Sequence, residues 1–127
     1  ARGGGGGLRG VGAGVVAGIR VDTVGVAIEP LGVRAGTEAA LVRVVNVFGA
    51  ARPHHAYLFA NRRANRMKVL VHDGIGVWLA ARRLNQGKFV WPRDGGLTVT
   101  LTRSQLDALV LGLPWQRIGE AGIISVL

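Results

Sequence analysis

The feature that most constrains the fold is a pair of strand-like runs around one turn dipeptide. Residues 66–72 and 77–82 both alternate in side-chain character, and Asp73-Gly74 lies between them. Asp-Gly strongly favours a tight turn, so this segment predicts a β-hairpin. Odd positions of the first run pair with even positions of the second, whether the turn takes two residues or four. The two faces of the hairpin can therefore be assigned from the sequence.

One face of this hairpin is apolar, and the other is mixed and cationic. The apolar face, which we expect to pack on the core, holds Met67, Val69, Val71, Trp78 and Ala80. The opposite face holds Arg66, Lys68, Leu70, His72, Val77, Leu79 and Arg83. Alternation of this kind is typical of an antiparallel sheet with one side toward water.

Further patterns extend the sheet and add two helices. Strands are predicted for residues 24–28, 57–60, 88–91 and 97–101. An apolar stripe predicts a helix over residues 38–48 with Thr37 as its cap, and a capping box at Thr102–Gln105 opens a second helix that ends near Leu111. The pattern predicts the α+β class: an antiparallel β-meander with two helices packed on one face.

Length and glycine content set the domain organisation. The chain has 127 residues, enough for one domain, and nine of its 21 glycines lie in the first 18 positions. We expect residues 1–18 to be a flexible Gly-rich tail and residues 19–127 to form a single α+β domain. The absence of cysteine excludes disulfides, thiolate zinc sites and cysteine nucleophiles. No apolar run is long enough to predict a membrane span.

The net charge of +9 is concentrated in one block. Residues 62–93 carry eight basic side chains against a single acid, Asp73. Such a block predicts a patch for a polyanion, most commonly nucleic acid. The candidate nucleic-acid-binding residues are Arg62, Arg63, Arg66, Lys68, Arg82, Arg83, Lys88 and Arg93, with Trp91 as a stacking platform.

The sequence offers little for catalysis or metal binding. Among its seven acids, no two have a spacing that forces them together on a metal ion. His54, His55 and His72 could in principle bind zinc, yet adjacent loop histidines are more often solvated. We therefore expect no catalytic residues, no metal and no cofactor.

Two long runs resemble a family signature. Residues 61–74 (NRRANRMKVLVHDG) and 76–92 (GVWLAARRLNQGKFVWP) are similar to the TnpB accessory proteins of insertion sequence family 66, which are unrelated to the RNA-guided nuclease of the same name. Leu101, Thr102 and Gln105 agree with a later element of that family, and the resemblance covers about residues 19–120. The chain departs from the family where Gly25 replaces a bulky residue, and again within residues 30–36.

The resemblance implies an accessory role in bacterial transposition, in the cytoplasm near the nucleoid. The implied partners are transposon-end DNA, a transposase of the Asp-Asp-Glu type and a second small accessory protein of the same element, with no membrane. It implies no catalytic residues.

Three hypotheses follow from the sequence. The first is a non-catalytic DNA-binding accessory factor. The second is a protein–protein adaptor for the transposase, favoured by the apolar Leu70, Val77 and Leu79 on the otherwise polar face. The third is a small nuclease or recombinase, which the scattered acids disfavour.

Overall fold

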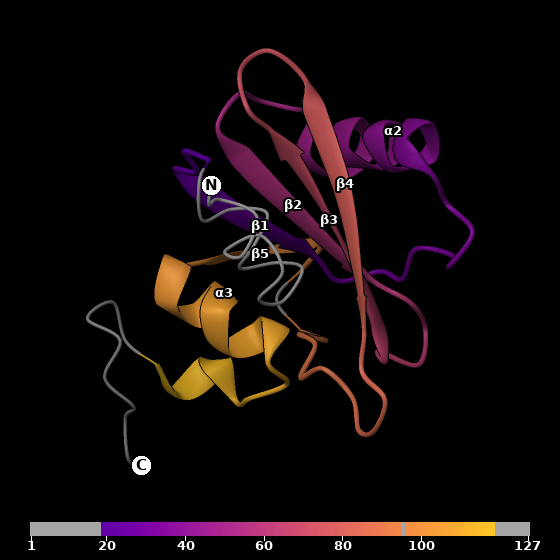
Figure 1. The fold of residues 1–127 in the computed structure, drawn as a ribbon, viewed down its shortest axis with the longest axis vertical. Coiled ribbons are helices and arrows are strands. Elements are labelled where there is room, and N and C mark those ends of the chain that lie inside the picture. The colour runs from indigo at the N-terminus through magenta and orange to yellow at the C-terminus, as the bar shows by residue number, and fades with distance from the viewer. Residues whose placement is uncertain (1–18, 95, 119–127) are drawn as a thin grey trace, which may run out of the picture.

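The computed structural model describes residues 19–94 and 96–118, so the expected tail over residues 1–18 lies outside the described part (Figure 1). Its elements in chain order are β1 (Thr23–Ala27), α2 (Thr37–Phe48), β2 (His55–Ala60), β3 (Arg66–His72), β4 (Val77–Arg83), β5 (Thr98–Leu101), α3 (Arg103–Val110) and the 3₁₀ turn η2 (Trp115–Arg117). The α+β class predicted from the sequence is confirmed. Over these residues, no helix has the length and apolar character needed to cross a membrane.

The five strands form a single mixed sheet in the order β4-β3-β2-β1-β5. β1 and β2 are parallel, while the other three neighbouring pairs are antiparallel. The expectation of a purely antiparallel meander is therefore wrong at this one pair. The reason is that α2 connects β1 to β2 as a crossover, and such a connection joins parallel strands.

The two helices cover opposite faces of the sheet, which corrects the expectation that both pack on one face (Figure 1). α3 packs on the face that carries Met67, Val69 and Val71. α2 packs on the other face, over Tyr57 and Leu70. A sheet covered on both sides buries both side-chain parities, so Leu70 is fully buried instead of facing water.

The β3–β4 hairpin is confirmed with the expected parity, since Val69 pairs with Ala80 and Val71 with Trp78. Its turn takes four residues and is closed by a bond from the Asp73 N–H to the Gly76 carbonyl oxygen (3.0 Å). The expectation that Trp78 lies in the core is wrong, because 53% of its surface is exposed. β4 is an edge strand, and the Trp78 indole N–H instead donates to the Asp73 carboxylate (2.8 Å).

This contact yields a prediction for acid pH. Hydrogen bonds from the Ile75 N–H, the Trp78 indole and the Gly76 N–H hold the pKa of Asp73 below its usual value of 3.8. The stabilisation is fully present above that usual value and is lost as pH falls through the lower folded-state pKa. We expect the NMR signal of the Trp78 indole proton to shift in that acid range. Asp73→Asn should remove this acid titration, and a wild-type signal that does not move at acid pH would contradict the assignment.

The other local predictions mostly agree with the structure. β1, β2 and β5 lie within two residues of the predicted strands, and both bonds of the Thr102–Gln105 capping box are present. Gly36, and not Thr37, occupies the cap position of α2. The strand predicted for residues 88–91 is wrong: the Phe89 N–H donates to the Ala64 carbonyl oxygen of the β2–β3 turn (2.7 Å) instead of to a neighbouring strand.

Candidate nucleic-acid interface

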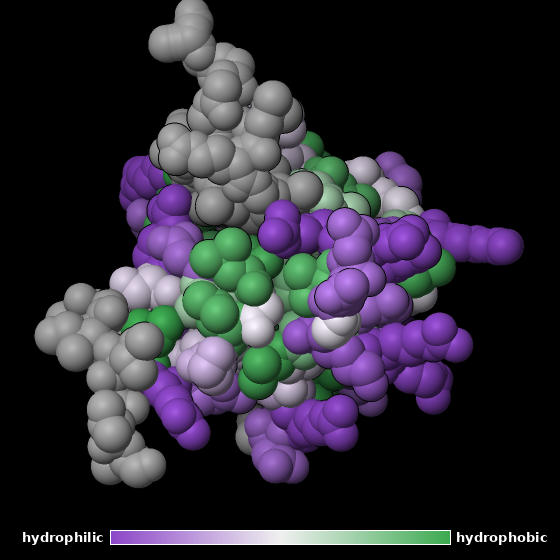
Figure 2. All heavy atoms as spheres, turned by 60° about the horizontal axis from the view of Figure 1, so that its bottom comes forward, coloured by the Kyte–Doolittle hydropathy of each residue, from purple (hydrophilic) through white to green (hydrophobic). Residues whose placement is uncertain are grey.

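All eight predicted basic residues converge on one end of the sheet, around the turn between β2 and β3. Each of them lines one of three adjoining hollows, of about 360, 450 and 310 Å³, and Asn61 lines all three. We call this set the basic end; it consists of Arg62, Arg63, Arg66, Lys68, Arg82, Arg83, Lys88 and Arg93. Figure 2 brings this end of the molecule forward and shows hydrophilic side chains gathered beside an apolar area.

The β2–β3 turn is fixed by its own hydrogen bonds. The Asn61 N–H donates to the Arg66 carbonyl oxygen (3.1 Å), and the Arg66 N–H donates back to Asn61 Oδ1 (3.0 Å). Asn61 Nδ2 donates to Asn65 Oδ1 (2.7 Å), and Ala64 adopts a positive φ of 58°. The turn therefore presents the exposed Arg62 and Arg63 from a defined backbone.

The segment after β4 is tied to the same turn. The Leu84 N–H donates to the Asn65 carbonyl oxygen (2.9 Å), and the Phe89 side chain is buried in the core. These attachments place Lys88 and Arg93 in the hollow that Arg62 also lines. Basic groups more than 25 positions apart in the chain thereby form one surface.

The basic end has few negative charges to neutralise it. The two ion pairs between described residues, Arg20–Asp22 and Arg103–Asp107, do not involve it. Glu29 is the one acidic residue that lines any of the three hollows, as far as the described chain goes. Positive groups without acidic partners create a potential that attracts an external anion, and the guanidinium fork suits phosphate oxygens.

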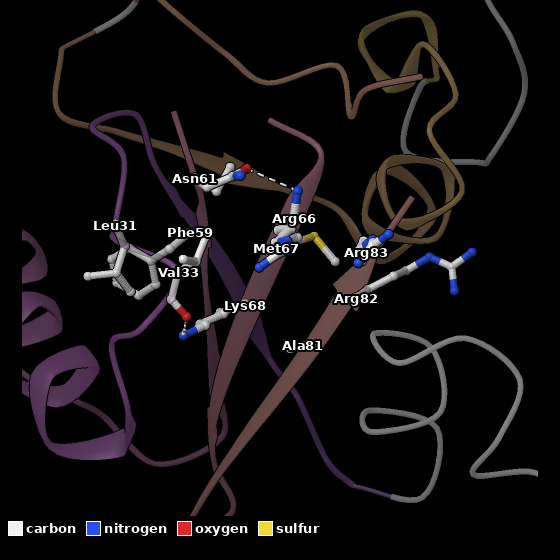
Figure 3. A pocket seen from close by; sticks show the side chains of 11 residues that line it. Leu31, Val33, Phe59, Asn61, Arg66, Met67, Lys68, Ala81, Arg82 and Arg83 are labelled. Atoms are coloured by element: carbon white, nitrogen blue, oxygen red, sulfur yellow. Dashed lines mark hydrogen bonds between the residues drawn. The ribbon is translucent and has the colours of Figure 1, made fainter. Parts of the chain in front are cut away.

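Two of the eight basic groups also hold the fold together. Lys68 Nζ donates to the Val33 carbonyl oxygen (2.7 Å; Figure 3). It also donates to the Ala35 carbonyl oxygen, and the two bonds fix the loop between β1 and α2. Arg82 Nε donates to the Val110 carbonyl oxygen (2.7 Å) at the end of α3. The other six side chains make no hydrogen bond or ion pair within residues 19–94 and 96–118: Arg62, Arg63, Arg66, Arg83, Lys88 and Arg93.

Trp91 lies at the basic end but is anchored there. Its indole N–H donates to the Ala27 carbonyl oxygen (2.8 Å), and its ring is half-buried against the core while lining the second hollow. The ring is therefore held in place, with part of its surface still accessible for stacking.

The three histidines lie at the opposite end of the sheet from the basic end. His55 pairs with His72 where β2 begins and β3 ends, and the His54 N–H donates to the His72 carbonyl oxygen (2.7 Å). Within the part of the chain that the structure describes, no three His, Asp or Glu side chains form a group able to hold a metal ion.

Sequence reasoning missed the residues that shape this end. Asn61 and Asn65 fix the turn, while Leu31, Val33, Phe59 and Ala81 line the first hollow. The only signal in the sequence was that two asparagines bracket Arg62 and Arg63, since asparagine is common in turns.

A family model described as "IS66 Orf2 like protein" matches residues 22–120. The chain belongs to this family. As an IS66 Orf2-like protein it has an accessory role associated with transposition, and the family is not a known enzyme family. The resemblance inferred from residues 61–92 is thus confirmed.

Two curated relatives, both from Sinorhizobium fredii, carry the printed description "uncharacterized protein". This IS66 Orf2-like chain is 34% identical to y4hO over 64 residues, which are 50% of this chain and 56% of y4hO. It is 32% identical to y4jC over 97 residues, which are 73% of this chain and 80% of y4jC. The chain thus spans little more than half the length of y4hO. No solved structure matches it significantly.

Proposed function

We propose that this protein is a DNA-binding accessory factor of transposition. It binds the phosphates of DNA through the basic end and performs no catalytic step itself. The observation that carries the proposal is the convergence of eight basic side chains on three adjoining hollows around one fixed turn. Six of these side chains have no partner among the described residues and are available to an external polyanion.

The partners we propose follow from the family. A transposition accessory protein works beside the transposase and the second accessory protein of the same element, and the DNA is that of the element ends. We propose accordingly that the protein acts at the bacterial nucleoid. The absence of a catalytic step is tested by incubating the protein with Mg²⁺ and element-end DNA; strand cleavage that a chelator abolishes would contradict it.

The salt dependence of DNA affinity tests the phosphate contacts directly. If the six free basic groups each contact a phosphate of duplex DNA, log K should fall with log salt at a slope of roughly −5. Fluorescence anisotropy of labelled element-end duplex over a salt series measures this slope. A slope near zero, or no binding at low salt by folded protein, would contradict the proposal.

A second candidate is a protein–protein adaptor for the transposase. Of the three residues that favoured it from the sequence, Leu70 is buried and Leu79 packs half-buried against the core, so they no longer support it, whereas Val77 is exposed. A different observation favours it: the β3–β4 hairpin tip exposes Ile75 (97%) and Trp78 (53%) at the end away from the basic end. An adaptor that does not touch DNA would show no anisotropy change in the same titration while still binding the transposase.

A further inference from the structure

The first hollow of the basic end is a pocket of about 360 Å³ with an apolar lining and a cationic rim. Ala81 and Val33 contribute exposed apolar surface from β4 and the β1–α2 loop, and the buried Leu31 and Phe59 also line the pocket (Figure 3). Arg66 and Arg83 line it from β3 and β4. We call it the sheet-end pocket. Its volume falls in the range of small-ligand sites, of about 300 to 1,000 Å³.

The rim of the sheet-end pocket contains an unfavourable pair of like charges. Arg66 and Arg83 are directly opposite each other in the register of β3 and β4. Like charges at directly opposed positions destabilise a sheet, and neither side chain has an acidic partner among the described residues. An anion bound between the two guanidinium groups would relieve this repulsion, so the rim is suited to a phosphate.

The polar side chains inside the pocket are already engaged. The Asn61 amide uses Oδ1 to accept from the Arg66 N–H and Nδ2 to donate to Asn65. Lys68 Nζ is engaged by the Val33 and Ala35 carbonyl oxygens. These bonds fix the orientation of both side chains within the fold, and burial of an apolar face is the main attraction that the pocket offers a ligand.

We propose that the sheet-end pocket takes one unpaired nucleotide of a DNA end, with the base against the apolar lining and its phosphate between Arg66 and Arg83. This inference rests on the proposed DNA binding and adds a preference for unpaired over fully paired ends. A nucleobase combines an apolar face with an adjacent phosphate, and it binds by stacking and burial without base-specific contacts. The pocket accepts the four bases with similar affinity.

The experiment compares two labelled duplexes of equal phosphate number, one blunt and one ending in three unpaired thymidines. Fluorescence anisotropy should show roughly tenfold tighter binding of the overhang. Ala81→Phe fills the pocket while keeping every cation, and it should bring the overhang affinity down to that of the blunt duplex. Thr100→Phe is the matched control, because Thr100 is also exposed on an edge strand, at the other side of the sheet. It should keep the preference.

A second readout follows the base itself. A 2-aminopurine placed in the overhang should become protected from acrylamide quenching when wild-type protein binds, but not when Ala81→Phe binds. If Ala81→Phe fails to melt cooperatively, Val33→Trp serves in its place, since Val33 also lines the pocket and is 43% exposed.

The outcomes separate this inference from the function on which it rests. Equal affinity of wild-type protein for both duplexes overturns the nucleotide pocket and leaves DNA binding in place. Overhangs of different bases that differ by much more than about threefold overturn the sequence-tolerant pocket. Failure to bind either duplex overturns the proposed function and the pocket with it.

Discussion

The double substitution Arg62→Glu with Arg66→Glu should weaken DNA binding on the order of a hundredfold at low salt. Neither arginine side chain has a partner among the described residues, so each would donate charge-assisted hydrogen bonds to phosphate, and each glutamate adds repulsion. The slope of log K against log salt should also become shallower by about 2, since two phosphate contacts are lost. Anisotropy titrations of wild type and variant over the same salt series measure both effects.

The matched control reverses two charges at other places. Arg52→Glu with Arg117→Glu changes the net charge by the same amount, and both residues are exposed and line none of the three hollows. If DNA responds only to overall charge, the two double variants lose affinity equally. An equal loss would therefore contradict a localised interface at the basic end.

The local signals in the sequence predicted local structure well. The Asp73-Gly74 hairpin and the Thr102–Gln105 capping box depend on residues within a few positions of each other, and the structure contains both. The basic end could be predicted for a similar reason. Most of its residues lie on one hairpin or beside it, so folding the hairpin already brings them together.

The features that could not be predicted from the sequence depend on contacts between segments that are distant along the chain. Parity places Trp78 on the face that α3 covers, yet Trp78 lies on the edge strand and is more than half exposed. Leu70 is buried because α2 crosses over its face, and nothing near Leu70 in the sequence encodes that crossover. The carbonyl oxygens that engage Lys68 and Arg82 are more than 25 residues away along the chain.

Gly25 lies against a residue that is distant along the chain, and this contact determines how a larger side chain at position 25 would affect stability. The resemblance to the TnpB family places a bulky residue at this position, where β1 carries glycine. The ring of Phe48, at the end of α2, occupies the space into which a side chain at position 25 would extend. A Cβ on Gly25 would lie 2.7 Å from Phe48 Cε1. The same ring packs edge-on against Tyr57, with centroids 4.8 Å apart. Gly25 and Phe48 therefore form a complementary pair in this chain.

Restoring a bulky residue at this position should destabilise this protein. Gly25→Trp should cost about 3 kcal/mol of unfolding free energy, because the indole and the Phe48 ring compete for one space. Phe48→Ala should cost about 2 kcal/mol by itself. Combined, the two substitutions should cost less than their sum by about 2 kcal/mol, since the indole then fills the vacated space. Urea denaturation of the four proteins measures this coupling, and strictly additive losses would show that Phe48 does not occupy the site of the missing side chain.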